Sequence, residues 1–231
     1  ILILAIEGWN ARFFEPETMP FLSEISKHFV VFPRHYSSGN NTLLGINGIV
    51  FGQTPALFFE QRAINAASEP IRRFRDNGFS IRRFAVHSNY RNFGSYMTGV
   101  EEDIDSRSTS TSETFPLIRR HLKAHDRTLS LYYYGDSHYP YRHATEYSRF
   151  QPEAEESMTI PSAATPVETA KIVNRYRNAL SEADARLEEL FASIDWKSMV
   201  VVVTGDHGES MMENGRLSHS SSLEEPQIRT P

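Results

Sequence analysis

Cysteine is absent from the 231-residue sequence. Its absence excludes a disulfide framework, a metal site built from thiolates and a cysteine nucleophile. An excess of positive charge is also missing, because 24 Lys and Arg residues stand against 29 Asp and Glu residues, a net charge of −5. Without a long basic run, this balance argues against nucleic acid as a partner.

Long hydrophobic runs are missing as well. No stretch approaches the about 20 consecutive apolar residues that cross a bilayer, and no signal peptide is visible. The chain opens directly in the apolar run ILILAIE and closes in EEPQIRTP without a terminating element. We therefore expect a single domain over residues 1–231 that is truncated at both ends, and any membrane attachment would come from segments outside this chain.

Short apolar runs alternate with amphipathic segments along the chain. The runs that predict strands are residues 1–6, 30–36, 79–88, 128–138 and 199–203. The segments with helical spacing are residues 16–29, 42–52, 69–78, 112–126 and 167–194. Such alternation predicts an α/β fold, in which helices cover both faces of a mainly parallel sheet in a three-layer αβα sandwich.

The densest strand signal is the valine run at residues 199–203, which predicts a strand buried on both faces. A long polar segment at residues 143–166, interrupted by prolines, predicts a lid or insertion loop. Asp184, on the longest amphipathic helix, is expected to be an exposed charge.

Acidic and imidazole side chains follow three of the predicted strands. Glu7 ends the first strand, Asp136 and His138 end the fourth, and Asp206 and His207 follow the valine run. Because the carboxyl ends of parallel strands share one edge of a sheet, we expect these side chains to converge. Oxygen and nitrogen ligands without sulfur suit one divalent ion, zinc or manganese.

Thr42 follows a Gly-Asn-Asn loop and stands in the first turn of a predicted helix. Backbone N–H groups and the helix dipole at that position favour an anion, either a phosphate oxygen or a threonine alkoxide. A threonine hydroxyl is a poor nucleophile at neutral pH, and a divalent cation lowers the pKa of an oxygen that it binds. Thr42 is therefore a candidate nucleophile.

Each candidate also has an ordinary structural explanation. Thr42 alone could cap a helix, Glu7 could be a surface residue, His138 could be a packed loop histidine, and Asp206 with His207 could form a turn. The coincidence of all of them at one predicted edge favours a functional site.

The chain resembles the alkaline phosphatase/sulfatase superfamily, and within it the membrane-anchored transferases of bacterial envelopes. These are the lipoteichoic acid synthases, the phosphoethanolamine transferases and the PbgA-like proteins. The resemblance is carried by ILAIEGWN, RHYSSGNNTLLGINGIVFG, DSHYPY, NRYRNALSEADARLEEL and TGDHGESMMENGRLSH, which span nearly the whole chain. It implies an alkaline-phosphatase-like fold and a domain facing the periplasm or exterior, held at the inner membrane.

The resemblance also implies roles for individual residues. Glu7, Thr42, Asp206 and His207 would bind one metal ion, and Thr42 would form a phospho-threonine intermediate. His138 and His219 match the histidines that contact the phosphoryl group or the leaving oxygen. The implied substrate is a phospholipid or another phospho-alcohol.

Two departures limit what the resemblance implies. Sulfatases use a Cys or Ser that is converted to formylglycine, whereas this chain has Asn41-Thr42-Leu43-Leu44, which disfavours sulfate-ester hydrolysis. Asp136 lacks the spacing of a second metal site, which favours a single metal ion. A non-catalytic module that binds lipid or a partner protein is the alternative, since some PbgA-like proteins act in this way.

Overall fold

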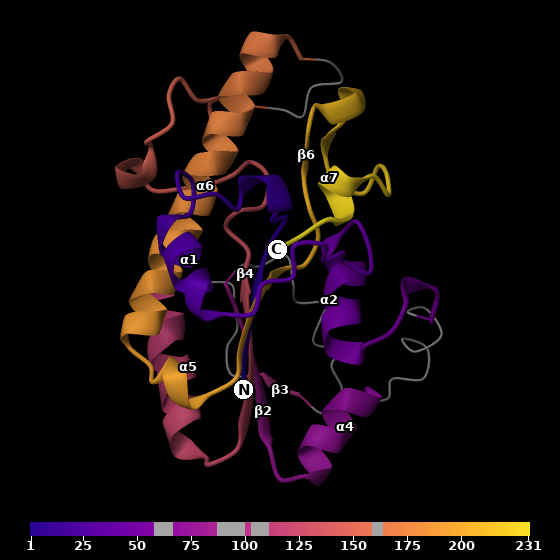
Figure 1. The fold of residues 1–231 in the computed structure, drawn as a ribbon, viewed down its shortest axis with the longest axis vertical. Coiled ribbons are helices and arrows are strands. Elements are labelled where there is room, and N and C mark those ends of the chain that lie inside the picture. Colours follow the sequence, from indigo (N-terminus) through magenta and orange to yellow (C-terminus); the bar gives the residue numbers. More distant parts are fainter. Residues whose placement is uncertain (58–66, 87–99, 103–110, 159–163) are drawn as a thin grey trace.

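The computed structural model describes residues 1–57, 67–86, 100–102, 111–158 and 164–231. Its centre is a five-stranded sheet in the order β3-β2-β4-β1-β5 (Figure 1). The strands are β1 (Leu2–Ile6), β2 (Ser80–Val86), β3 (Glu101–Glu102), β4 (Thr128–Tyr134) and β5 (Val201–Gly205). All neighbouring strands run parallel, so their carboxyl ends share one edge, as the sequence predicts.

Helices cover both faces of this sheet, which confirms the α/β sandwich. Figure 1 shows α1 (Pro20–Ile25), α5 (Thr111–Ala124) and α6 (Pro166–Ala192) on one face. The other face carries α2 (Thr42–Phe51) and α4 (Glu69–Asp76). A hairpin of β6 (Ser210–Met211) and β7 (Leu217–Ser218) and the short helix α7 (Glu225–Ile228) follow β5. Within the described residues, no helix is long and apolar enough to cross a membrane.

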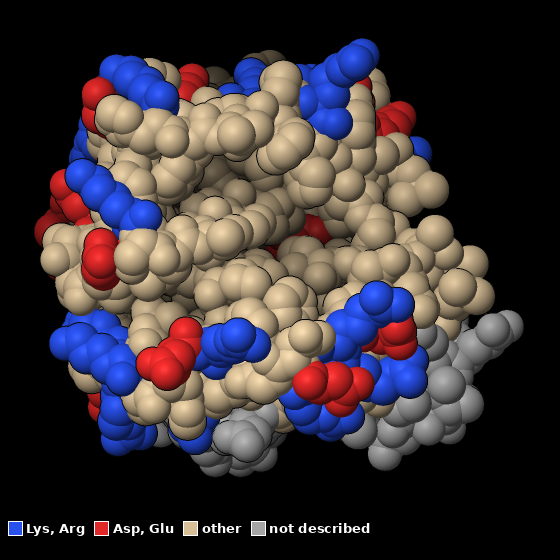
Figure 2. All heavy atoms as spheres, turned by 60° about the horizontal axis from the view of Figure 1, so that its bottom comes forward, with Lys and Arg blue, Asp and Glu red and all other residues tan. Residues whose placement is uncertain are grey.

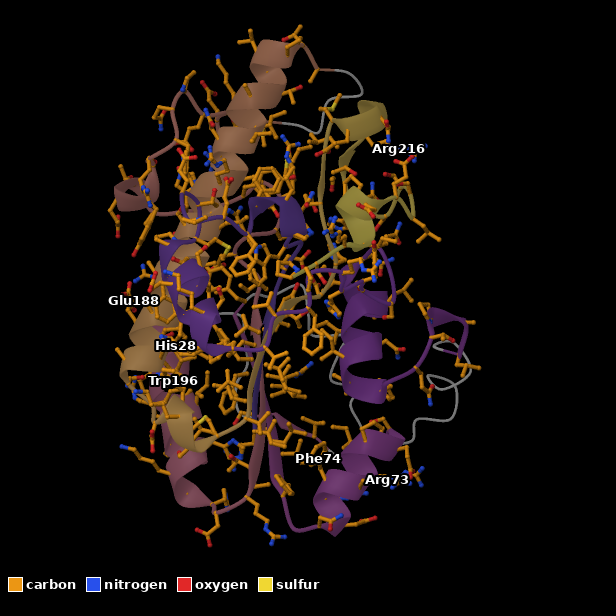
Figure 3. The ribbon with its side chains drawn as sticks, in the orientation of Figure 1. His28, Arg73, Phe74, Glu188, Trp196 and Arg216 are labelled. Atoms are coloured by element: carbon orange, nitrogen blue, oxygen red, sulfur yellow. The ribbon has the colours of Figure 1, made fainter. Side chains whose placement is uncertain are left out.

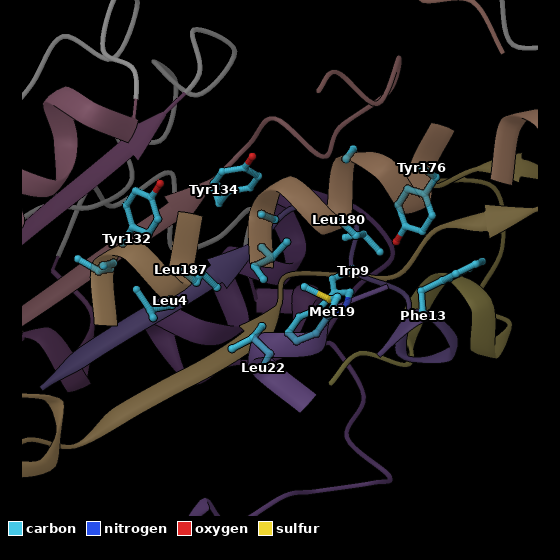
Figure 4. Close-up of a cluster of buried hydrophobic side chains, with 14 of the residues drawn as sticks. Leu4, Trp9, Phe13, Met19, Leu22, Tyr132, Tyr134, Tyr176, Leu180 and Leu187 are labelled. Carbon is cyan, nitrogen blue, oxygen red and sulfur yellow. The ribbon is translucent and has the colours of Figure 1, made fainter. Parts of the chain in front are cut away.

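The core lies on both sides of the sheet because successive residues of a strand face opposite layers. On β4, Tyr132 and Tyr134 pack with Leu180 and Leu187 of α6 in one cluster (Figure 4). The intervening Tyr133 belongs to a second cluster with residues of α2 and α4. On α4, Phe74 turns toward the sheet and Arg73 points away from it (Figure 3).

Asp184 is buried, and the expectation of an exposed charge is wrong. Its exposure is 2%, and its two carboxylate oxygens accept hydrogen bonds from the backbone N–H groups of Phe21 and Leu22. These N–H groups lie in the first turn of α1, where no intrahelical acceptor exists. Asp184 therefore joins α6 to the start of α1.

The valine run forms β5, but this strand is not buried on both faces. β5 is the edge strand of the described sheet and pairs only with β1, so Val202 remains 41% exposed and the preceding Val200 61% exposed. Apolar composition identified the strand correctly but contains no information about its place in the strand order.

Residues 30–36 do not form the expected strand. Only Tyr36 makes a bridge, with Arg229, while Val30 and Phe32 are exposed. The segment lines an apolar groove beside β5 together with His28 and Trp196, which Figure 3 labels. Figure 2 shows that the lower side of the molecule is hollowed, with mostly uncharged residues in the hollow and charged side chains around it.

The polar segment at 143–166 packs along α6 over its described residues, and residues 159–163 lie outside the description. Asn178 of α6 bonds to the backbone of Phe150, and Arg175 donates to the carbonyl of Ala154. Tyr139, which follows His138, donates its hydroxyl to the carbonyl of Met158. The segment is thus tied to the turn that carries His138, and its role as a lid stays a prediction.

Candidate active site

Three separate parts of the chain bring four predicted residues together. Glu7 directly follows β1, Asp206 and His207 directly follow β5, and Thr42 is the first residue of α2. The register pairs Ile6 with Gly205, so the ends of β1 and β5 lie side by side. Glu7, Asp206 and His207 are fully buried, and Thr42 is only 8% exposed. This burial rules out a surface role for Glu7. Thr42 is not the cap of α2, because Asn41 caps that helix.

The donor atoms of these residues face one another. Thr42 Oγ1 lies 3.0 Å from Oε2 of Glu7 and 3.3 Å from Nε2 of His207. His207 Nε2 lies 3.1 Å from Oε1 of Glu7 and 3.6 Å from Oδ2 of Asp206. Five polar atoms from four side chains therefore form a compact cluster.

Backbone groups orient the side chains of Asp206 and His207. Oδ1 of Asp206 accepts from the N–H groups of Gly8 at 2.9 Å and of His207 at 2.8 Å, which leaves Oδ2 toward the cluster. Nδ1 of His207 lies 2.7 Å from the carbonyl of Gly208. A carbonyl can only accept, so Nδ1 carries the proton and Nε2 of the neutral ring is free to bind a cation.

The position of Thr42 depends on close contact between α2 and the end of β5. A Cβ atom on Gly45 would lie 2.0 Å from the carbonyl oxygen of Asp206, so only glycine permits this approach. Ser37, in the loop before α2, donates its hydroxyl to the same carbonyl. The loop that precedes Thr42 and the strand that precedes His207 are therefore joined directly.

Burial and mutual charge shift the pKa values of the three ionisable groups strongly. Burial opposes ionisation of Glu7, but the neighbouring His207 outweighs it and lowers the pKa to about 2. Burial and the charge of Glu7 raise the pKa of Asp206 well above its usual range. Burial also opposes protonation of His207, yet Asp206 and Glu7 raise its pKa to about 10. Without a metal ion, protons must compensate the buried negative charge.

The geometry and chemistry of the cluster fit a divalent metal ion. Four ligands placed tetrahedrally at about 2.0–2.1 Å from zinc lie about 3.3 Å from one another. The distances of 3.0 and 3.3 Å from Thr42 Oγ1 and of 3.1 and 3.6 Å from His207 Nε2, which involve both oxygens of Glu7, are close to that spacing. Glu7, Asp206 and His207 each offer an atom within 4.8 Å of the others, and the oxygen and nitrogen set suits zinc or manganese.

His138 and His219 lie beside this cluster. The ring of His219 is 4.4 Å from that of His207 and 5.4 Å from that of His138. One nitrogen of each of the two histidines lies within 4.8 Å of a carboxylate oxygen of Glu7. Both histidines are only partly buried, unlike the four residues of the cluster.

Glu209 and Tyr141 also belong to the site, although sequence reasoning did not single them out. Glu209 is 2% exposed and its carboxylate lies 2.8 Å from Nδ1 of His219. The hydroxyl of Tyr141 donates to the other oxygen of Glu209 at 2.7 Å. The strings GDHGE and HYPY contain both residues, but neither periodicity nor spacing distinguishes them from ordinary core residues.

Asp136 is separate from the cluster. Burial raises its pKa to about 6, and the charges that act on it belong to Glu182, Arg142 and Arg186. Glu182 and Arg186 lie on α6, on the far side of the sheet from α2. Within the described residues, Asp136 takes part in no group that could hold a metal ion.

Comparison with known structures gives the same fold over the entire chain. The lipooligosaccharide phosphoethanolamine transferase A of Neisseria meningitidis matches with a TM-score of 0.74 and 16% identity over 100% of this chain. The periplasmic domain of EptC from Escherichia coli, in complex with zinc, matches with a TM-score of 0.78 and 13% identity over 100% of this chain. The lipoteichoic acid synthase LtaP of Listeria monocytogenes matches over 100% with a TM-score of 0.69 and 15% identity.

These proteins are longer than the present chain, which spans 46%, 70% and 64% of them, respectively. No curated protein matches in sequence. The model of one protein family, described as Sulfatase, matches residues 4–231. That match includes every residue of the cluster and both neighbouring histidines, and the chain belongs to the sulfatase family.

Proposed function

We propose that this chain is the catalytic domain of a metal-dependent phosphoryl-group transferase or phosphodiesterase of the bacterial envelope, with Thr42 as its nucleophile. The observation that carries the proposal is the cluster of Thr42 Oγ1 with Glu7 and His207 at 3.0 and 3.3 Å. Glu7, Thr42, Asp206 and His207 would hold the metal ion, zinc or manganese. When bound, this ion would supply the positive charge that lowers the pKa of the Thr42 hydroxyl.

The proposed reaction has two displacements at phosphorus. Oγ1 of Thr42 attacks the phosphorus of a phospho-alcohol and forms a P–O bond, while the P–O bond to the donor alcohol breaks. The proton that Thr42 gives up balances the one that the leaving oxygen takes up. His138 and His219 are placed to contact the phosphoryl group and to carry that proton. An acceptor alcohol or water then attacks the phospho-threonine and restores the hydroxyl.

Three features support a phospholipid or other phospho-alcohol head group as the substrate. The structural neighbours include phosphoethanolamine transferases and a lipoteichoic acid synthase. Another neighbour is a phosphonate monoester hydrolase of Silicibacter pomeroyi. In this chain the nucleophile position is a threonine rather than the Cys or Ser that becomes formylglycine, which argues against sulfate esters. The neighbours also support a membrane-held domain facing the periplasm.

Replacement of Thr42 tests the proposal. We expect Thr42→Ala to lower turnover of a phosphodiester such as bis(p-nitrophenyl) phosphate or a fluorescent phosphatidylethanolamine by about 10³-fold or more, because no alternative nucleophile lies in the cluster. Thr42→Ser, which keeps a hydroxyl, is the matched control and should retain measurable turnover. Mass spectrometry of the wild type during turnover should reveal a peptide in which Thr42 carries the phosphoryl group together with the alcohol that the first displacement leaves attached to it.

Undiminished turnover by Thr42→Ala would contradict the proposal. A metal-loaded wild type that turns over no phosphodiester, yet binds phospholipid vesicles, would instead favour the non-catalytic module.

A further inference from the structure

Glu209 is a buried carboxylate with a partner on each of its oxygens. It is not one of the four proposed metal ligands, although it forms, with His207 and His219, another group whose atoms lie within 4.8 Å of one another. Its Oε1 accepts from the hydroxyl of Tyr141 at 2.7 Å, and its Oε2 lies 2.8 Å from Nδ1 of His219. Its backbone carbonyl accepts from the side-chain amide of Asn10 at 2.8 Å. Burial of a carboxylate costs free energy unless hydrogen bonds compensate it, so the contacts that Glu209 makes call for an explanation.

The contact with Glu209 determines which nitrogen of His219 carries a proton. With no metal ion between the two side chains, an ionised carboxylate only accepts hydrogen bonds, so Nδ1 of His219 is the protonated atom. Nε2 of the neutral ring then keeps its lone pair. Ser218 cannot take over this role in the observed geometry, because its hydroxyl lies 3.5 Å from Nδ1, at the outer limit of a hydrogen bond.

Packing holds Glu209 and the imidazole in place. Tyr141 is fully buried, and its ring packs against Tyr176 of α6 at 5.2 Å. Gly8 leaves the room that Oε2 of Glu209 occupies, because a Cβ atom there would lie 3.2 Å from this oxygen. The imidazole of His219 lies 4.4 Å from that of His207, with the two ring planes tilted by 48°. Rotation of the His219 ring would therefore break a short hydrogen bond as well as a packing contact.

We infer that Glu209, held by Tyr141, is a positioning residue that keeps His219 in its Nδ1–H form and directs Nε2 of the ring toward the substrate. The step from tautomer to catalysis rests on the proposed function; the tautomer itself does not. Tyr141 of the HYPY string and Glu209 of the GDHGE string therefore orient the same histidine, His219.

Nuclear magnetic resonance of ¹⁵N-histidine-labelled protein tests the tautomer directly. Two-bond nitrogen–proton correlations distinguish the Nδ1–H from the Nε2–H form, and His219→Gln identifies the signals of this ring. The spectra are recorded on the whole chain without added metal, at a pH where the ring is neutral. We expect Nδ1–H in the wild type and in Glu209→Gln, which keeps an acceptor oxygen, and a shift toward Nε2–H in Glu209→Ala.

Kinetics on the zinc-loaded protein provide the second readout. Loss of an orienting partner typically costs about 10- to 100-fold. We expect Glu209→Ala to lower kcat by that factor with little change in KM or zinc content, Glu209→Gln to restore most of it, and Tyr141→Phe to have a smaller effect. Tyr132→Phe removes a buried hydroxyl that has no hydrogen-bond partner among the described residues, so this control should behave like the wild type.

Retention of the Nδ1–H form in Glu209→Ala would overturn the inference, as would an altered tautomer with unchanged kcat. If the tautomer changes as expected but the wild type turns over no phosphodiester, the proposed function fails while the role of Glu209 in fixing the His219 ring stands.

Discussion

Single atoms decide which side chains can serve the proposed metal site. His207 presents Nε2 because the carbonyl of Gly208 engages its Nδ1, and Asp206 presents Oδ2 because two backbone N–H groups engage its Oδ1. Both side chains are fully buried, so water cannot replace these partners. A cation that binds to these atoms would therefore displace protons from the cluster.

Metal binding should therefore release protons. The pKa of His207 is raised to about 10, since Asp206 and Glu7 outweigh the effect of burial, and a ligating imidazole must be neutral. We expect one equivalent of zinc or manganese to bind, with an affinity that rises by about tenfold per pH unit for each proton released between about pH 6 and 8. Calorimetry in buffers of different ionisation enthalpy counts the protons.

Asp206→Asn is the matching variant, because it keeps the shape of the side chain but loses its charge. It should bind zinc much more weakly than the wild type. An affinity independent of pH, or full zinc content in this variant, would count against the cluster as a metal site.

At the scale of elements, the site depends on how closely α2 approaches β5. The contact is made at Gly45, one turn after Thr42, where any Cβ atom would overlap the carbonyl of Asp206. β5 is the edge strand of the described sheet, which leaves Val202 partly exposed. The carboxyl end of this strand is buried at the cluster, whereas its outer side is accessible to solvent.

Gly45→Ala should move α2 away from β5. Alanine in a helix is ordinarily about 0.5–1 kcal/mol more favourable than glycine, so any loss must come from the clash with Asp206. We expect a net loss of about 1–3 kcal/mol in the free energy of unfolding, measured with urea, together with weaker zinc binding. A variant as stable as the wild type, with unchanged zinc affinity, would show that this close approach is not required.

At the scale of the whole molecule, the two faces of the sheet serve different purposes. The face under α2 and α4 leads to the cluster, whereas α1, α5 and α6 cover the other face with the larger group of buried side chains. Asp136 lies just after β4, where the charges of Glu182 and Arg186 of α6 act on it.

The stability of the fold should depend on pH through Asp136. Burial raises its pKa from 3.8 to about 6, so the folded state holds a proton that the unfolded chain releases, and stability falls as pH rises from about 4 to 6. We expect Asp136→Asn to raise the free energy of unfolding at pH 8 by on the order of 1 kcal/mol and to change little at pH 4. Urea unfolding at both values tests this.

Asp195→Asn, which removes an exposed carboxylate just after α6, is the control and should leave both values unchanged. An equal effect of Asp136→Asn at pH 4 and pH 8 would rule out titration of this side chain as the cause.

The sequence by itself determined the α/β class and the placement of Glu7, Asp206 and His207 at strand ends, because apolar runs and helical spacing are local properties. It also located Thr42 at the start of a helix. Strand order depends on packing between distant segments, so only the tertiary structure placed β1 beside β5 and left β5 at the edge of the described sheet. For the same reason only the structure joined Glu209 to His219 and Tyr141, excluded Asp136 from the cluster and buried Asp184 against α1. Side-chain periodicity shows which face a residue occupies, but not which residue it meets there.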